Sequence, residues 1–383
     1  MKFSSLFSFL GIALSIYAAA NLYIWIHLAR VIPYLGSLRI PVLVGFWLLV
    51  AAFPLGRIGG TIFRCRFTDT LAVLGSWYMA AMIMALLMLG LLDILLVADQ
   101  WLRIFPDSLA RRPEMARLVF FWVIVSLTVI FVAAGRWNAI HPVLREYEIT
   151  LRGTPQDAPV RVVVATDLHV GLMVKNHWLG RMIEVINSAS PDVVLLVGDT
   201  VDSDATHAQE ERLSDELALI SAPLGVYAVL GNHEFYSGAQ EAVNSYEAGG
   251  VRVLRDECVV IGDAFTLLGR DDRVSPRMGL NRLPLAEIPG VNGGLPVIVM
   301  DHTPSHLGEA EKAGVALQVS GHTHRGQLWP FNYITAHIFE QDWGFLKKGK
   351  TLYYISCGVG VWGPPIRTSS RPEVVVLKIR FEP

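Results

Sequence analysis

Hydrophobic residues are distributed unevenly along this chain, and this distribution constrains its fold more than any other feature. Nearly all of the apolar excess lies before about residue 136. Four apolar stretches in that region are close to the roughly 20 residues that a helix needs to cross a bilayer. They are Ser4–Leu28, Ile40–Leu55, Leu71–Val97 and Leu118–Ala134. We therefore expect residues 1–136 to form a helical transmembrane anchor of about four spans.

The first two stretches admit other interpretations. The first follows Lys2, as a signal peptide would, but its apolar region is too long and three more follow it. We therefore expect it to remain as an anchor. The second is the weakest, because Pro41 and Pro54 bracket a short apolar core. A re-entrant or tilted segment is the alternative there.

The charges of the loops do not determine the membrane orientation. An even number of spans puts the N-terminus and the C-terminal domain on the same side, and the loops of the two sides carry equal numbers of positive residues. The positive-inside rule therefore does not decide. Our working expectation is a multi-pass protein of the inner, or plasma, membrane with its C-terminal domain in the cytoplasm. The lipid bilayer is the expected partner. The net charge of −2 gives no reason to expect nucleic acid, and no protein partner is indicated.

The composition changes at residues 137–159, where prolines and charged residues interrupt the apolar pattern. We expect a linker there and a globular domain over residues 160–383. Short valine-rich runs then alternate with helix-like segments, as in an α/β domain with a parallel or mixed sheet. The expected strands are Val160–Ala165, Val193–Val197, Val226–Leu230, Phe265–Leu268, Pro296–Met300, Leu317–Ser320, Leu352–Ser356 and Val374–Ile379. The expected helices are Asn176–Ser188, Ala208–Ile220, Ala239–Glu247 and Ser305–Ala313.

Clusters of Asp, His and Asn follow five of the expected strands. In open α/β sheets, binding sites form beyond the carboxyl ends of the strands, so these clusters are expected to converge. Each cluster alone has a structural explanation, such as a cap or a turn, but five together are hard to explain in that way. The clusters are Asp167-Leu168-His169, Asp199-Thr200-Val201-Asp202, Asn232-His233-Glu234, Asp301-His302 and His322-Thr323-His324.

These residue types favour a metal site. Oxygen and imidazole donors without cysteine suit manganese, iron or zinc. The donors are too many for one cation, whereas two cations that share a carboxylate would use them all. Two dications with Asp167, Asp199 and a hydroxide keep a net charge of +1, which favours an anionic substrate such as a phosphoester.

The order of the motifs resembles the calcineurin-like metallophosphoesterase superfamily over the span from Arg161 to Phe381. The motifs are Asp-x-His, Gly-Asp, Gly-Asn-His-Glu, a single His and Gly-His-x-His. The longer Ser-Gly-His-Thr-His-Arg-Gly-Gln-Leu-Trp-Pro-Phe segment resembles the membrane-anchored bacterial branch of YkuE-type phosphoesterases. The resemblance implies a β-sandwich flanked by helices and a metal-bridging hydroxide that attacks phosphorus.

The resemblance also implies a role for each residue. Two divalent ions are expected, with manganese favoured and iron, zinc or magnesium as alternatives. His233 is expected to donate a proton or stabilise charge, with Glu234 or Asp202 orienting it. Arg325 and Arg367 are expected to contact phosphate, or else to be solvated loop residues. The implied ligands are Asp167, His169 and His324 for one metal, Asn232, His302 and His322 for the other, and Asp199 as the bridge.

Several functions remain open at this point. Ser203 after Asp202 and Leu230 before Gly231 depart from the pattern of protein serine/threonine phosphatases. The anchor favours a phosphodiester, phosphomonoester or pyrophosphate of a lipid or nucleotide-lipid as substrate. One alternative is an enzyme that acts on soluble nucleotides. Another is a membrane receptor or transport component whose soluble domain binds a phosphorylated ligand without turnover. His233 favours catalysis, because a binding module needs no proton donor.

Overall fold

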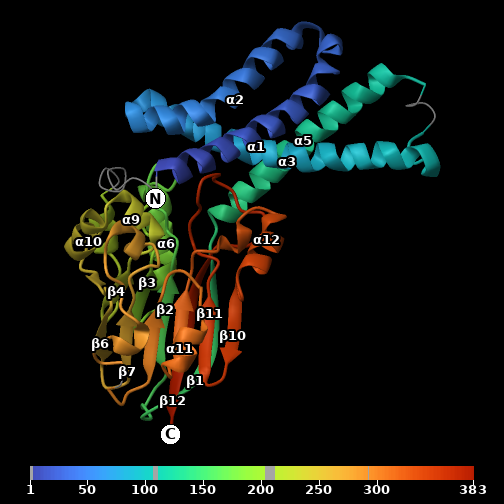
Figure 1. Ribbon diagram of the computed structural model, residues 1–383. Helices are drawn as coiled ribbons and strands as arrows, with labels where there is room; N and C mark the ends of the chain where they lie inside the picture. Colours follow the sequence, from blue (N-terminus) through green and yellow to red (C-terminus); the bar gives the residue numbers. More distant parts are fainter. Residues whose placement is uncertain (1–2, 107–110, 203–211, 292) are drawn as a thin grey trace. The chain divides into compact units, whose positions relative to one another are not determined.

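A computed structural model describes residues 3–106, 111–202, 212–291 and 293–383 (Figure 1). The chain divides into two compact units, Met1–Arg136 and Trp137–Pro383. The first unit is helical and the second contains the β-sheets.

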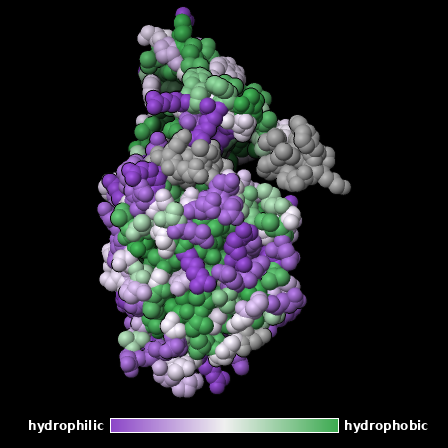
Figure 2. All heavy atoms as spheres, turned by 90° about the vertical axis from the view of Figure 1, so that its left-hand side faces the viewer, coloured by the Kyte–Doolittle hydropathy of each residue, from purple (hydrophilic) through white to green (hydrophobic). Residues whose placement is uncertain are grey.

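The helical unit contains α1 (Phe3–Ala29), α2 (Arg39–Ile62), α3 (Arg66–Leu102) and α5 (Pro113–Ala139), with the 3-10 turns η1 (Ile32–Tyr34) and η2 (Gly36–Leu38) between the first two. Within the described part of the chain, four helical segments are long and apolar enough to cross a membrane. Helix α2 continues through Pro54, so the weakest expected span is one helix of sufficient length. Hydrophobic side chains cover much of the surface of this unit (Figure 2).

The second unit is built on two mixed sheets, each of six strands among the described residues. The first has the order β1 (Val143–Arg152), β12 (Glu373–Glu382), β2 (Val160–Ala165), β3 (Val193–Val197), β4 (Val226–Val229) and β5 (Arg252–Val253). The second has the order β10 (Gly344–Lys348), β11 (Thr351–Ile355), β9 (Leu317–Ser320), β8 (Val297–Met300), β7 (Phe265–Gly269) and β6 (Glu257–Ile261).

The two sheets pack face to face, and helices cover their outer faces. Because side chains alternate along a strand, Val162 and Val164 of β2 pack in the core shared with the second sheet. Val163 and Ala165 pack on the other side, in a core to which α6 (Asn176–Ser188), α8 (Leu213–Leu217) and α10 (Ala239–Ala248) contribute. Helix α11 (Gly308–Lys312) contributes Ala310 to the core on the outer face of the second sheet. The expected sandwich flanked by helices is confirmed.

The linker expected at residues 137–159 was wrong in part, because it contains strand β1. This strand pairs in parallel with β12 from Val143 opposite Glu373 to Arg152 opposite Glu382. Tyr147 and Ile149 pack against the core between the sheets, and the alternate residues Glu146, Glu148 and Thr150 are exposed. In β1, half-buried residues alternate with exposed ones, including two glutamates. This alternation is the pattern of a half-buried strand, but the charged residues made the segment resemble a linker.

All eight expected strands are present, with ends that differ by up to three residues. Besides β1, the short strands β5, β6 and β10 were missed. Of the expected helix Ala208–Ile220, residues 208–211 lie outside the described part, and α8 covers Leu213–Leu217. The helices α9 (Asn232–Ser237) and α12 (Phe331–Ile338) and the turns η3 (Ser275–Met278), η4 (Leu285–Glu287) and η5 (His324–Gly326) complete the unit.

Candidate metal centre

The seven expected ligands all follow the carboxyl end of a strand. Strands β2, β3 and β4 run parallel to one another in the first sheet, and β8 and β9 run parallel in the second. The residues are Asp167 and His169 after β2, Asp199 after β3, Asn232 after β4, His302 after β8, and His322 and His324 after β9.

One group contains Asp167, His169 and His324, all buried. The Nε2 atoms of the two histidines lie 3.0 Å apart. Asp167 Oδ1 lies 3.4 Å from the Nε2 of His324 and 3.9 Å from that of His169. The Thr166 hydroxyl donates to Asp167 Oδ2 over 2.9 Å. Three ligand atoms from two different sheets therefore face a common point.

A second group contains Asp199, His302 and His322. His302 Nε2 lies 3.0 Å from Asp199 Oδ2. The other ring nitrogen of His302 lies 2.8 Å from the Val197 carbonyl, so Nδ1 carries a proton and Nε2 faces the carboxylate. Burial lowers the pKa of His302, but the charge and the hydrogen bond of Asp199 raise it, to a net value well above its usual range. The buried Oδ1 of Asn232, the fourth residue expected here, has no hydrogen-bond partner among the described residues.

Asp199 lies between the two groups. The same Oδ2 that contacts His302 lies 3.9 Å from His169 Nε2. Its Oδ1 accepts a hydrogen bond of 2.9 Å from the backbone N–H of His233. A carboxylate in this position has one oxygen facing ligands of both groups.

The donor set fits divalent cations. Burial lowers the pKa of His169 to about 3 and that of His322 to about 4, so both rings are neutral at neutral pH, which is the form that binds metals. Burial raises the pKa of Asp199, but the charge and hydrogen bond of His302, together with His233 and His169, lower it, so the net pKa is well below its usual value. Imidazoles, carboxylates and an unpartnered amide oxygen are suitable ligands for such ions.

The backbone around these side chains is unusual in two ways. Five of the seven residues adopt a positive φ, between 48° and 71°, which non-glycine residues rarely do outside strained or functional segments. They are Asp167, His169, Asp199, His322 and His324. In addition, a Cβ atom at Gly231 would clash with Asp199, and one at Gly321 would clash with Asp167. The loops are therefore packed closely around both carboxylates.

This arrangement agrees with comparisons with known proteins. The model of the calcineurin-like phosphoesterase family matches residues 160–326. An uncharacterized metallophosphoesterase of Aquifex aeolicus is 34% identical over 241 residues, which cover 62% of this chain and 91% of that protein. The chain belongs to the calcineurin-like phosphoesterase family. Together with the Asp and His clusters, this membership identifies it as a metal-dependent phosphoesterase, as expected.

Two other relatives bear on its branch of the family. The uncharacterized metallophosphoesterase YkuE of Bacillus subtilis is 26% identical over 57% of this chain and 79% of its own length. A protein of Danio rerio named as a transmembrane protein with a metallophosphoesterase domain is 27% identical over 66% of this chain and 61% of its own length. The resemblance to YkuE-type phosphoesterases is confirmed, and the apolar helices occur in a family with relatives named as transmembrane proteins.

His233 lies beside the groups and contacts one of its two expected partners. Its Nδ1 lies 3.2 Å from Asp202 Oδ1. Burial lowers the pKa of His233, but the hydrogen bond to Asp202 and the charges of nearby carboxylates raise it, to a net value of about 8. Its ring also lies 4.7 Å from that of His169.

Glu234 has other contacts. Its fully buried carboxylate accepts hydrogen bonds from the backbone N–H groups of Asp199, Val201 and Gly231, at 3.0, 2.9 and 2.7 Å. The Tyr246 hydroxyl donates a fourth, over 2.7 Å. The carboxylate therefore joins the loops after β3 and β4, and we assign Glu234 to positioning of Asp199 and not to His233.

The two arginines expected to contact phosphate have contacts within the protein. Arg367 is fully buried and donates to the carbonyls of Gly360 and Cys357, at 2.9 and 2.7 Å, and to His324 Nδ1 at 3.0 Å. The guanidinium of Arg325 stacks over the Trp343 ring, 4.2 Å from its centroid. Arg367 therefore contacts the candidate ligand His324 at Nδ1, and its buried side chain is not exposed to a substrate.

Three aromatic residues beside the centre were missed. The rings of Tyr236 and Trp362 lie 6.2 and 6.4 Å from that of His233, and Phe339 lies 6.0 Å from His322. Tyr236 follows the Gly-Asn-His-Glu motif by two residues, which was the available signal for it. Nothing in the sequence pattern around Trp362 or Phe339 indicates that they approach the site.

Proposed function

We propose that this chain is a two-metal phosphoesterase that cleaves a phosphodiester, phosphomonoester or pyrophosphate bond in a lipid or nucleotide-lipid. We further propose that it is a multi-pass protein of the inner or plasma membrane with its active site in the cytoplasm. The observation that carries the choice of a lipid is an exposed apolar surface next to the candidate metal centre.

The residues that would hold the ions form two sets joined by Asp199. Asp167, His169 and His324 would hold one ion, and Asn232, His302 and His322 the other. Divalent cations in these positions, manganese by preference, would neutralise phosphate charge and lower the pKa of water towards neutrality. The protein itself supplies a buried, pre-arranged set of ligands on closely packed loops.

His233 would act on the leaving group. It is the histidine held by a carboxylate, Asp202, and its pKa of about 8 keeps it mainly protonated at neutral pH. A protonated imidazole beside the centre can donate its proton to the departing oxygen, or stabilise negative charge on the phosphoryl oxygens. A module that only binds phosphorylated ligands has no use for such a donor.

The exposed apolar surface, here called the apolar rim, comes from α12 and two nearby tryptophans. Helix α12 has no buried residue in its described sequence. Tyr333 and Ile338 are 66% and 67% exposed. The rim borders the centre at Trp362, near His233, and through Phe339, near His322. Its members are Trp329, Phe331, Tyr333, Ile334, Ile338 and Trp362.

An apolar surface of this kind fits a lipid better than a nucleotide. Clustered exposed aromatic and aliphatic side chains mark sites of contact with membranes or other apolar partners. A short amphipathic helix with aromatic residues is suited to the interface between headgroups and acyl chains. In a chain with helices able to cross a bilayer, the substrate that matches the rim is one whose phosphoester lies at a lipid surface.

Comparison of two substrates tests this proposal. Hydrolysis by the full-length, metal-loaded protein is measured on a phospholipid in vesicles and on a soluble aryl phosphate. Ile338→Glu is expected to lower the ratio of lipid to aryl phosphate turnover about tenfold or more, since it places a charge on the rim. Leu219→Glu is the matched control, because Leu219 is 61% exposed and lies outside the rim.

Other outcomes would favour the alternatives. An unchanged ratio in Ile338→Glu, with good activity on free nucleotides, would favour a soluble nucleotide as substrate. Tight binding of phosphorylated ligands without metal-dependent hydrolysis of any phosphoester would favour a receptor or transport component.

A further inference from the structure

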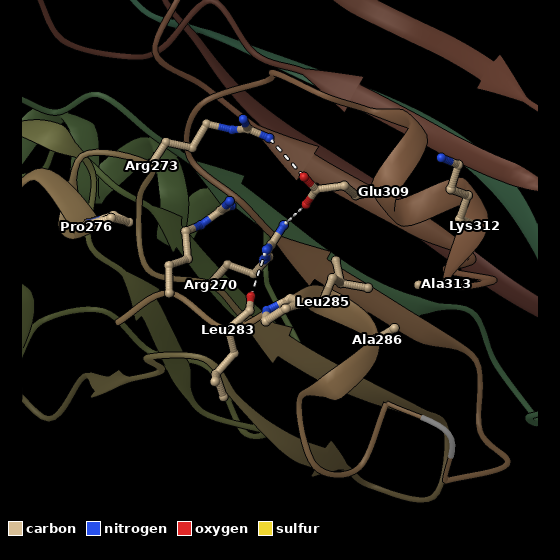
Figure 3. Close-up of a pocket in the computed structure, with 11 residues that line it drawn as sticks. Arg270, Arg273, Pro276, Leu283, Leu285, Ala286, Glu309, Lys312 and Ala313 are labelled. Carbon is tan, nitrogen blue, oxygen red and sulfur yellow. Dashed lines mark hydrogen bonds and ion pairs between the residues drawn. The ribbon is translucent and has the colours of Figure 1, made fainter. Parts of the chain in front are cut away.

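A cavity lined by both charged and apolar side chains lies at the end of the second sheet, apart from the seven candidate ligands. It has a volume of about 590 Å³, within the range of small-molecule sites. Its walls are the segment after β7, which includes Arg270, Arg273 and Arg282, and helix α11, which contributes Glu309 and Lys312 (Figure 3). None of the proposed metal ligands lines it.

The cavity carries an excess of positive charge. Three guanidinium groups and one ammonium group line it, against the carboxylate of Glu309. A second carboxylate, Asp301, lies behind the wall, 3.2 Å from Arg270 and 2.7 Å from Arg282. The side chains of Arg270 and Arg282 are only 3% and 9% exposed. Asp301 and Glu309 compensate these two guanidinium groups, so the remaining positive charge is that of Arg273, which is 23% exposed, and of Lys312, which is exposed. This excess favours an anion in the cavity.

Glu309 already occupies the position of an anion. One of its carboxylate oxygens lies 2.8 Å from Arg270 and the other 3.6 Å from Arg273 (Figure 3). The side chain of Glu309 is 44% exposed, so it can turn towards solvent without breaking core packing. The buried Nε atoms of Arg270 and Arg273 lack hydrogen-bond partners among the described residues. Donors in this state are rare in folded proteins and normally have a partner.

The cavity is coupled to the candidate metal centre through one short segment. Arg270 and Arg282 hold Asp301, which directly precedes His302. Arg273 donates to the backbone carbonyl of Ser305, three residues beyond His302, over 2.7 Å. A ligand that draws these arginines away from Asp301 or Ser305 would therefore act on both sides of His302.

We propose that this cavity is a second anion site that binds a phosphate group, carried either by a lipid headgroup or by a soluble phosphate compound. Arg270 and Arg273 face the two carboxylate oxygens of Glu309. The same guanidinium groups can bind a phosphate, because a phosphate, like a carboxylate, accepts paired N–H donors. The phosphate would displace Glu309 and take up donors of Arg270 and Arg273, with Lys312 at the mouth of the cavity.

Binding of inorganic phosphate to the full-length, metal-loaded protein tests the proposal by calorimetry. We expect a phosphate site that persists when the metals are chelated, which separates it from any phosphate bound at the metal centre. The double variant Arg273→Gln/Lys312→Gln is expected to weaken that site about tenfold or more, through loss of charge-assisted hydrogen bonds. Glu309→Gln is expected to tighten it several-fold, because the competing carboxylate is gone.

The gain in affinity separates a ligand site from a structural ion cluster. A cluster that only supports the fold would lose stability in Glu309→Gln and bind phosphate no more tightly. Arg252→Gln is the matched control, since Arg252 is exposed, pairs with Glu257 and lies away from the cavity. The proposal is wrong if the double variant and Glu309→Gln both bind phosphate as the wild type does, whether or not the chain hydrolyses lipids.

Vesicles distinguish the two sources of phosphate. Proteoliposomes that contain phosphatidic acid are compared with ones of phosphatidylcholine alone. If phosphatidic acid, at increasing content, competes with inorganic phosphate for the chelation-resistant site, the ligand is a headgroup. If it does not compete while the variants alter phosphate binding as expected, the ligand is a soluble phosphate compound.

Discussion

The Nη2 atom of Arg367 lies 3.0 Å from Nδ1 of His324, while the Nε2 atom of the same imidazole faces His169 and Asp167. Because arginine can only donate, Nδ1 accepts in this contact, so the proton of the neutral ring lies on Nε2 and must leave before that nitrogen can bind an ion. We expect Arg367→Met to weaken metal binding at this position several-fold, because the ring loses the contact that fixes its orientation and the positive charge that favours its unprotonated form. Metal titration followed by elemental analysis measures it.

The same substitution is expected to lower the free energy of unfolding by roughly 2–4 kcal/mol, because the buried carbonyls of Cys357 and Gly360 lose their donor. Arg371→Met is the control, since Arg371 is exposed on the same segment. Normal metal affinity in Arg367→Met would contradict the role given to this arginine.

Asp199→Asn is expected to reduce the metal content at both positions, because its carboxylate lies between the two groups. Elemental analysis of the purified protein should fall from about two ions per chain to less than one. Loss of a single ion would mean that Asp199 serves one group only.

His233→Ala is expected to keep its metals and to lower kcat by about 10²–10⁴-fold, the usual contribution of a general acid. Asp202→Asn is expected to have a smaller effect and to move the loss of activity at high pH to lower pH. The reason is that its carboxylate raises the pKa of His233. Release of metal from His233→Ala would instead show that this histidine is a ligand.

Glu234→Gln is expected to destabilise the protein by roughly 3 kcal/mol or more, because a buried acceptor of three N–H groups is replaced by an amide that also carries donors. Tyr246→Phe, which removes one of the four hydrogen bonds to Glu234, is expected to cost about 1 kcal/mol. Denaturant unfolding compares the pair. Equal stability of Glu234→Gln and wild type would mean that the carboxylate does not hold these loops.

The position of strand β1 determines the shortest fragment that we expect to fold as the second unit. Arg145 of β1 pairs over 2.8 Å with the fully buried Glu373. A protein that begins at residue 160 leaves this carboxylate without its guanidinium, at a cost of roughly 3–5 kcal/mol. We expect residues 137–383 to give soluble, cooperatively unfolding protein and residues 160–383 to aggregate. Similar thermal unfolding of the two would contradict this.

The sequence predicted the strands that carry the site, because each is a short apolar run that is followed directly by a motif of Asp, Asn or His. It did not predict Arg367 or Glu234 as supporting residues. The contacts of Arg367 with His324 and of Glu234 with Asp199 join residues 43 and 35 positions apart, and no local pattern encodes them. Strand β1 was missed because its outward glutamates resemble a linker. Helix α12 was missed because its apolar residues are exposed, whereas periodicity arguments assume that such residues are buried.

The hydrogen bonds of Glu234 have a consequence for how the protein acquires its ions. This carboxylate links the loops after β3 and β4 around Asp199 through hydrogen bonds of the protein itself. We therefore expect that one ion can replace another after synthesis while these loops stay folded. The ion present in the cell would therefore reflect the supply around the mature protein more than the conditions under which the chain was made.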